Sequence, residues 1–251
     1  MELALSKKYR AALNLQKVVS YINFPWFGTF IVGLLYLLGG YRCENVGELR
    51  SRVRAMLDEV GDRPLVICSN HLTMIDSMLI STFLFFYGSY MYRFRLFPWN
   101  VPEVLNFGKN LPLRIMCYLG KCVFVERGGT LRSKKLTWEK LRYLVEQREL
   151  VCIFPEGGRS RSGRVEPENS VYGVGHLLQE VGDCHVLCVY LRGEGQKSFS
   201  FFPARKETFH VDVRMIRPRT EHSGRRGARD MTLQAMNQIK DMEDQYLAGG
   251  K

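Results

Sequence analysis

The sequence predicts an α/β domain in which a mixed, largely parallel sheet is flanked by helices, together with an N-terminal membrane-associated helical element. Three observations lead to this prediction. Apolar, β-branched runs at residues 64–68, 150–154 and 186–191 have the length and composition of buried strands. A segment with helical spacing at residues 130–148 precedes the second run, and a strand–helix–strand order favours parallel pairing. Residues 18–41 carry no charged side chain.

The N-terminal segment has the composition of a membrane-binding helix. Pro25 interrupts the uncharged stretch, and the strongly apolar part after it, residues 26–38, is too short to cross a bilayer comfortably. We therefore expect a kinked or re-entrant pair of helices that enters one leaflet, with a single transmembrane span and a helix buried against the domain as alternatives. This divides the chain into membrane-associated helices at residues 1–60 and an α/β domain at residues 61–251.

The remaining segments show further helical and strand-like patterns. Charged residues alternate with apolar ones at helical spacing in residues 46–60, which predicts an amphipathic helix leading into the domain. Residues 87–120 combine aromatic residues, prolines and arginines, and this composition predicts loops and short helices. We expect further helices at residues 174–181 and 228–247, and late strands at residues 199–202 and 210–216.

Composition narrows the class of partner and the compartment. The chain of 251 residues carries a net charge of +11, which favours an anionic partner. No nucleic-acid-binding motif is present, so a membrane surface and a phosphorylated substrate explain the charge better than nucleic acid. The seven cysteines form no Cys-x2-Cys pair, which favours reduced core residues and the cytoplasmic face of a membrane. We expect no metal site and no bound cofactor.

A histidine and an aspartate follow the first predicted strand. His71 lies at a strand-to-helix turn, and Asp76 comes five residues later. Five residues on one continuous helix would separate two side chains by about 140°, so His71 must precede the helix start for Asp76 to reach it. Such a pair acts as a general base: imidazole takes a proton from a hydroxyl, and the carboxylate orients imidazole. The alternative is a surface histidine with an aspartate favoured by the helix dipole.

A second polar loop follows the strand at residues 150–154. It contains a carboxylate, Glu156, then two glycines and an arginine, Arg159. Glycines let the backbone approach a ligand closely, and guanidinium groups bind phosphate through paired hydrogen bonds. The alternative is a polar turn with solvated arginines.

The two motifs together resemble a known family. The pattern Asn70-His71-x4-Asp76, followed by residues 154–160, is similar to the PlsC-like glycerolipid acyltransferases, typified by 1-acylglycerol-3-phosphate O-acyltransferase. Residues 120–127 resemble a second block of that family, an apolar strand that ends in an acidic residue and an arginine. Residues 186–193 resemble a fourth block. The resemblance runs from about residue 64 to about residue 213.

The resemblance implies transfer of a fatty acyl group from acyl-CoA or acyl carrier protein to a hydroxyl, with lysophosphatidic acid as the default acceptor. By this resemblance His71 is the general base and Asp76 orients it. Neither an acyl-enzyme intermediate nor a metal is needed, because the thioester is already activated. The resemblance also implies a set of substrate-binding residues. In this set Asn70 helps to hold the turn, Glu156 hydrogen-bonds the acceptor beside the amides of Gly157 and Gly158, and Arg127 and Arg159 bind the acceptor phosphate.

Several departures from the family pattern concern the acceptor. Gly158 stands where the family usually has threonine, and Cys188 replaces a usual proline. Residues 93–100, upstream of Arg127, offer only arginines where a lysine is expected, and Lys109 is out of register. A lyso-ornithine lipid or a secondary-metabolite hydroxyl is therefore an alternative acceptor. Two other readings stay open at this point: a thioesterase that uses water at the same base, and a non-catalytic basic protein that binds membrane lipids.

Overall fold

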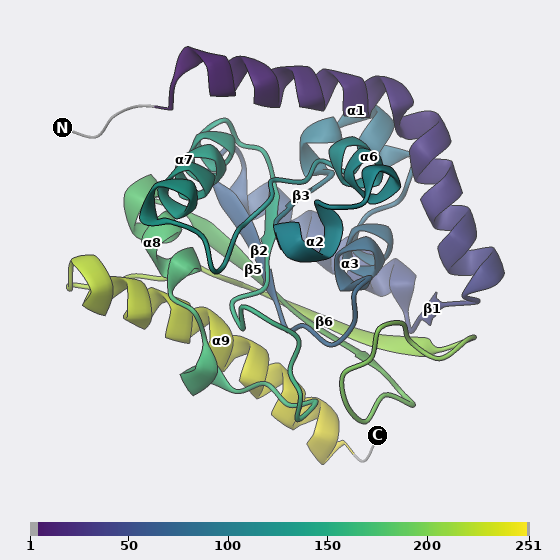
Figure 1. Cartoon of the computed structure of the whole chain (residues 1–251). Helices are drawn as coiled ribbons and strands as arrows, with labels where there is room; N and C mark the ends of the chain where they lie inside the picture. Colours follow the sequence, from purple (N-terminus) through teal and green to yellow (C-terminus); the bar gives the residue numbers. More distant parts are fainter. Residues whose placement is uncertain (1–4, 250–251) are drawn as a thin grey trace.

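A single mixed sheet organises the computed structural model, which describes residues 5–249. Within these residues it is a 6-stranded sheet with the order β1-β6-β5-β2-β4-β3. Strands β5, β2, β4 and β3 run parallel, whereas β6 is antiparallel to β5 and β1 is parallel to β6 (Figure 1). The predicted mixed, largely parallel sheet is confirmed. The strands are β1 (Arg42–Cys43), β2 (Leu65–Ser69), β3 (Trp99–Asn100), β4 (Val151–Ile153), β5 (His185–Gly193) and β6 (Thr208–Ile216).

Helices cover both faces of this sheet (Figure 1). The helices predicted at residues 46–60, 130–148, 174–181 and 228–247 are present as α2, α7, α8 and α9. The helical elements are α1 (Lys7–Gly33), η1 (Leu34–Leu38), α2 (Val46–Val60), α3 (Asp76–Leu84), α4 (Ser89–Tyr92), η2 (Phe94–Leu96), α5 (Val104–Phe107), α6 (Leu111–Leu119), α7 (Leu131–Glu146), η3 (Pro167–Asn169), α8 (Gly173–Val181) and α9 (Gly224–Ala248).

The hydrophobic core has two halves, one on each face of the sheet. Val66 and Cys68 of β2 pack in the half formed with α7, α8 and α9. Leu65 and Ile67 face the other half, which contains residues of α2 and α3 and Phe24 of α1. Every residue of β2 and β5 is buried, which explains why these strands read as continuous apolar runs without alternation.

The parallel strands direct three loops to one edge of the sheet. Cys68 of β2 pairs with Ile153 of β4, and Ser69 pairs with Val189 of β5, so these strands end at the same edge. The segments that follow them are residues 70–75, 154–163 and 194–207. In sheets of this kind, ligands bind outside the carboxyl ends of the parallel strands.

The N-terminal segment differs from the predicted pair of helices. Pro25 lies inside one helix, α1, which bends along its length and continues into η1 (Figure 1). Residues 7–38 are long and apolar enough to cross a membrane, by length and composition only. The first half of α1 nevertheless packs on the domain, where the Gln16 side chain donates to the carbonyl oxygens of Tyr118 and Cys122, both at 3.1 Å. The division at residue 60 stays a prediction.

One predicted strand was wrong. Residues 199–202 have a strand-like aromatic pattern, but they form part of the loop between β5 and β6. Their backbone groups pair with the turn after β2: Ser200 N–H donates to Leu72 O at 3.0 Å, and Met74 N–H donates to Phe201 O at 3.1 Å. The segment therefore satisfies its hydrogen bonds at the edge of the sheet without joining it as a strand.

Candidate active site

The turn after β2 brings His71 and Asp76 together. Asp76 is the first residue of α3, and its Oδ2 lies 3.0 Å from His71 Nδ1. The same oxygen accepts from the N–H groups of Leu72 at 2.6 Å and Thr73 at 2.8 Å. The side chain of Asp76 is only 3% exposed, so these donors stabilise a carboxylate that has little contact with water. The predicted placement of His71 before the helix start is confirmed.

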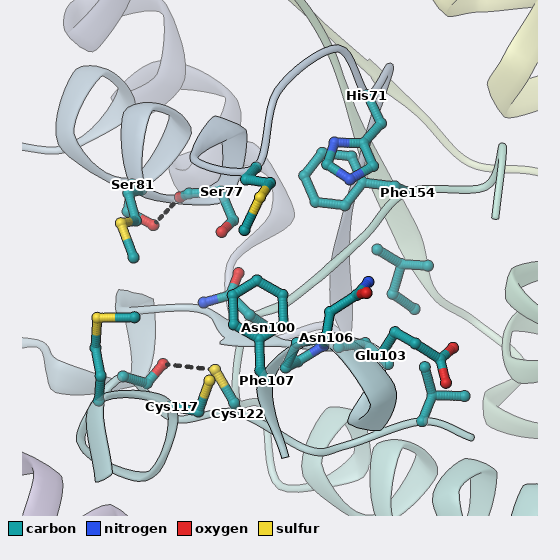
Figure 2. Close-up of a pocket in the computed structure, with 18 of the residues that line it drawn as sticks. His71, Ser77, Ser81, Asn100, Glu103, Asn106, Phe107, Cys117, Cys122 and Phe154 are labelled. Carbon is teal, nitrogen blue, oxygen red and sulfur yellow. Dashed lines mark hydrogen bonds between the residues drawn. The ribbon is translucent and has the colours of Figure 1, made fainter. Parts of the chain in front are cut away.

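This contact determines which nitrogen of His71 is free to act. An ionised carboxylate only accepts hydrogen bonds, so Nδ1 carries the proton and Nε2 keeps its lone pair. The imidazole stacks on Phe154 with ring centroids 4.2 Å apart, and both residues line the same cavity (Figure 2). The sequence placed Phe154 in the motif of residues 154–160 but gave it no role of its own. In the structure the two ring planes lie 21° apart, so Phe154 packs on the face of the imidazole.

Asn70 and Glu156, both in the expected substrate-binding set, contact the turn that carries His71, and the expectation that Asn70 helps to hold this turn agrees with its contacts. The Asn70 amide exchanges hydrogen bonds with the backbone of Leu191 in β5, at 2.9 and 2.8 Å. Glu156 Oε1 accepts from His71 N–H at 3.1 Å, and Ser160 N–H donates to His71 O at 2.9 Å. Neither Asn70 nor Glu156 lines the cavity. Their geometry favours positioning of His71 over contact with substrate.

Burial also changes the acidity of Glu156. It raises the pKa of this carboxyl to about 8, because the charged form loses its solvation, while the hydrogen bond from His71 N–H acts in the opposite direction. The carboxyl is therefore largely protonated at neutral pH. A neutral side chain at this position avoids an unpaired buried charge next to Asp76.

Replacing Glu156 by glutamine is expected to change how stability depends on pH. The folded-state pKa of about 8 lies above the ordinary value of 4.5, so the stability that this proton contributes is present below about pH 4.5 and is lost as pH rises through 8. Across that window the wild type should lose stability relative to Glu156→Gln, by up to about 1.4 kcal/mol per pH unit. Urea unfolding of both proteins at about pH 5 and about pH 8 measures the difference. If the free energy of unfolding changed equally with pH in both proteins, the assigned pKa would be wrong.

The glycines after Glu156 have separate roles. Gly157 has a φ of +66°, and a Cβ there would meet the Val171 side chain at 2.8 Å, so both conformation and space require glycine. A Cβ on Gly158 would lie 3.6 Å from Nη1 of Arg127. The departure from threonine at Gly158 therefore lies directly beside Arg127.

Arg127 is held by an acidic residue that the sequence did not single out. Glu103 Oε2 lies 3.1 Å from Arg127 Nε, and the Arg127 N–H contacts the two carboxylate oxygens at 3.4 and 3.3 Å. This ion pair engages Nε and leaves the Nη edge of the guanidinium beside Gly158. Glu103 lies in residues 87–120, where the sequence pattern was uninformative, and no local signal connected it with Arg127.

Arg159 lies in the same cavity as Arg127 but is held by a different segment. Its Nη1 donates to Ser200 O at 3.2 Å, and its guanidinium lies over the rings of Phe201 and Phe199, at 4.7 and 5.7 Å. These cation–π contacts anchor Arg159 against the β5–β6 loop. The structure thus brings both predicted arginines to one cavity, where Lys134 and Arg161 also lie.

The cavity is large and chemically divided. Its volume is about 1420 Å³, larger than most pockets for compact small molecules. Figure 2 shows His71 and Glu103 in one part of it, with Ser81 and Cys117 in another. The apolar part is built by α1, α3 and the segment after α3. The cationic part is built by the loop after β4, which carries Arg159 and Arg161, together with Arg127 before α7 and Lys134 on α7. The apolar lining includes Phe24, Phe27, Ile31, Met78, Phe85 and Phe86.

The cysteines lie either in the wall of the cavity, as Cys117 and Cys122 do, or away from it. Among residues 5–249 no group of three or more His, Cys, Asp or Glu side chains is placed to hold a metal ion. All seven cysteines are free, and Cys188 is fully buried in β5. Cys188, which replaces the usual proline, therefore belongs to the core and does not line the cavity.

Comparison with known proteins agrees with this geometry. A sequence model of the acyltransferase family matches residues 44–192, more than half of the chain. The chain belongs to the acyltransferase family. The resemblance to the 1-acylglycerol-3-phosphate O-acyltransferase family is thereby confirmed, and the reading as a non-catalytic membrane-binding protein is set aside. A search of curated proteins returned no match. The matched segment of this acyltransferase includes His71, Asp76, Arg127 and Arg159, and it ends before the β5–β6 loop.

Proposed function

We propose that this acyltransferase moves a fatty acyl group from acyl-CoA or acyl carrier protein to a hydroxyl of a lysophospholipid-like acceptor, with lysophosphatidic acid as the default. One observation carries the proposal. The His71–Asp76 pair opens on a single cavity that is apolar in one part and cationic in another. An acyl chain and a phosphate group of one amphiphilic substrate match these two parts.

The geometry supports a direct transfer. His71 Nε2 takes the proton of the acceptor hydroxyl while the hydroxyl oxygen attacks the carbonyl carbon of the thioester. The new C–O bond forms a tetrahedral intermediate, which collapses with cleavage of the C–S bond. The proton on Nε2 then passes to the departing thiolate, so the products are the ester and the free thiol. Asp76 stabilises the imidazolium between the two proton transfers.

The cationic part of the cavity supports a phosphorylated acceptor. The Nη edge of Arg127 faces the backbone at Gly158, and an arginine fork of this kind binds a phosphate through two hydrogen bonds. Arg159 adds a second positive charge to the same cavity. The residues of α1 and α3 in the apolar part would then contact acyl chains.

The N-terminal helix supports association with a membrane. Trp26, Phe30 and Leu37 are between 59% and 82% exposed, which is unusual for large apolar side chains in water. The first half of α1 is tied to the domain by Gln16 and by an ion pair between Lys17 and the buried Glu149. A helix anchored in this way favours contact with one leaflet over a span. The free cysteines favour the cytoplasmic face.

Thiol release from long-chain acyl-CoA and acyl carrier protein, with and without lysophosphatidic acid, tests the proposal. Acceptor-dependent release is expected, and Arg127→Ala should raise the KM for lysophosphatidic acid about 10- to 100-fold, because a charged hydrogen bond is lost. The KM for monoacylglycerol, which has no phosphate, should not change. Release that needs no acceptor would identify a thioesterase. Release only with a lyso-ornithine lipid or another hydroxyl would overturn the phosphorylated acceptor.

A further inference from the structure

The loop between β5 and β6, residues 194–207, exposes three phenylalanines. Phe199, Phe201 and Phe202 are 40%, 63% and 62% exposed. Clustered aromatic side chains in contact with water mark a surface that another apolar phase covers. The loop lies beyond residues 44–192, so the family match does not account for it.

The backbone of this loop is fixed although its aromatic side chains are exposed. Its middle pairs with the turn that carries His71, through Ser200 N–H to Leu72 O at 3.0 Å and Met74 N–H to Phe201 O at 3.1 Å. Tyr41 Oη also donates to Pro203 O at 3.3 Å. The exposure of the phenylalanines is therefore a consequence of a defined backbone path.

The loop continues the exposed apolar surface of the N-terminal helix. Lys206 N–H donates to Gly39 O at 2.6 Å, directly after η1, and Figure 1 shows the loop close to the end of this helix and β1. Phe199 and Phe201 line the same cavity as Tyr36 and Phe86. Exposed apolar side chains from η1, from the β5–β6 loop and from the segment after α3 thus line this cavity or are adjacent in sequence to residues that line it. We call this set the apolar rim: Tyr36, Leu37, Leu38, Phe86, Phe199, Phe201 and Phe202.

The charges of the loop favour a lipid surface as the covering phase. Lys197, Arg205 and Lys206 are exposed, against one exposed acidic residue, Glu194. Aromatic residues flanked by cations are typical of segments that lie at the interface of an anionic bilayer. The loop adjoins a helix that is long and apolar enough for a membrane. A binding surface for a protein would not require this neighbour, so the arrangement favours lipid.

We propose that the β5–β6 loop is a second membrane contact, which inserts its phenylalanines into the interface of an anionic bilayer while Lys197, Arg205 and Lys206 meet lipid headgroups. Together with α1 and η1 it places the apolar rim, and hence the cavity, at the lipid surface. Because the loop backbone also holds the turn of His71, the contact fixes the distance between the bilayer and the imidazole. The inference does not depend on which donor or acceptor the enzyme uses.

Fluorescence quenching tests insertion directly. The full-length variant Trp26→Phe/Phe202→Trp places a reporter in the loop, and Trp26→Phe alone is its control. Both are mixed with vesicles of phosphatidylcholine and phosphatidylglycerol that carry brominated acyl chains, which quench indole on contact. Additional quenching and a blue shift in the double variant are expected. Identical quenching in both variants would overturn the proposal.

Vesicle sedimentation separates insertion from unspecific attraction. Phe202→Ser should weaken binding about tenfold, and Arg205→Ala/Lys206→Ala about fivefold for each cation removed. The matched control is Arg225→Ala/Arg226→Ala at the start of α9, at the opposite end of the β5–β6 hairpin, which removes the same charge and should leave binding unchanged. Equal losses in both charge variants would overturn the proposal. So would unchanged vesicle binding of Phe202→Ser together with weaker binding of acyl carrier protein.

Discussion

Replacing His71 by alanine is expected to lower the rate of acceptor-dependent acyl transfer by about three orders of magnitude. General-base assistance by a positioned imidazole contributes roughly 10²- to 10⁴-fold, and Nε2 of His71 is the group that faces the cavity with its lone pair free. The loss should appear in kcat, because the side chain takes part in the transition state more than in binding. Steady-state thiol release with saturating acceptor measures it.

The control for this prediction is a histidine outside the cavity. His176 on α8 is exposed, and His176→Ala should keep the wild-type rate. Unfolding curves of both variants show whether the fold is intact. A His71→Ala protein that is folded and retains more than about a tenth of the wild-type kcat would refute general-base catalysis by this residue.

Replacing Asp76 by asparagine is expected to lower kcat by roughly 10³- to 10⁴-fold. An amide NH₂ group can donate to Nδ1, so the imidazole would carry its proton on Nε2 and could not accept one from a hydroxyl. The variant also lacks the charge that stabilises the imidazolium. The KM values should change little, because the buried Asp76 does not line the cavity.

Asp76 also accepts from two backbone N–H groups, so stability must be measured beside activity. Asp58→Asn on the exposed side of α2 is the matched control, with no expected effect on kcat or on the unfolding midpoint. If the fall in kcat of Asp76→Asn equals the fall in the fraction of folded protein, Asp76 has only a structural role.

The predictable part of the structure came from features with a short sequence range. The buried strands β2, β4 and β5 were visible as apolar runs because both faces of the sheet are covered by helices. The contact between His71 and Asp76 could be proposed because the two residues are only five positions apart, and helix geometry then requires His71 to precede the helix start. The helices α2 and α7 were visible through their periodicity.

The unpredicted part involves residues that meet across long sequence separations. Glu103 and Arg127 are 24 residues apart, and Arg159 and Ser200 are 41 apart. Nothing in the local pattern of either partner indicates such a contact, because hydrogen bonds and ion pairs depend on the path of the chain between them. Residues 199–202 show the same limit, since their aromatic pattern was typical of a strand and their true partner was the turn after β2.

The sequence by itself therefore determined the class of fold, the pair of residues that meet within one turn, and the family to which the enzyme belongs. Tertiary structure alone decided that Glu156 contacts the His71 turn, that Glu103 orients Arg127, and that the β5–β6 loop supports Arg159. The physical reason is the distance along the sequence over which each kind of interaction acts. Side-chain periodicity acts over a few residues, whereas a site is assembled where parallel strands bring distant loops to one edge of a sheet.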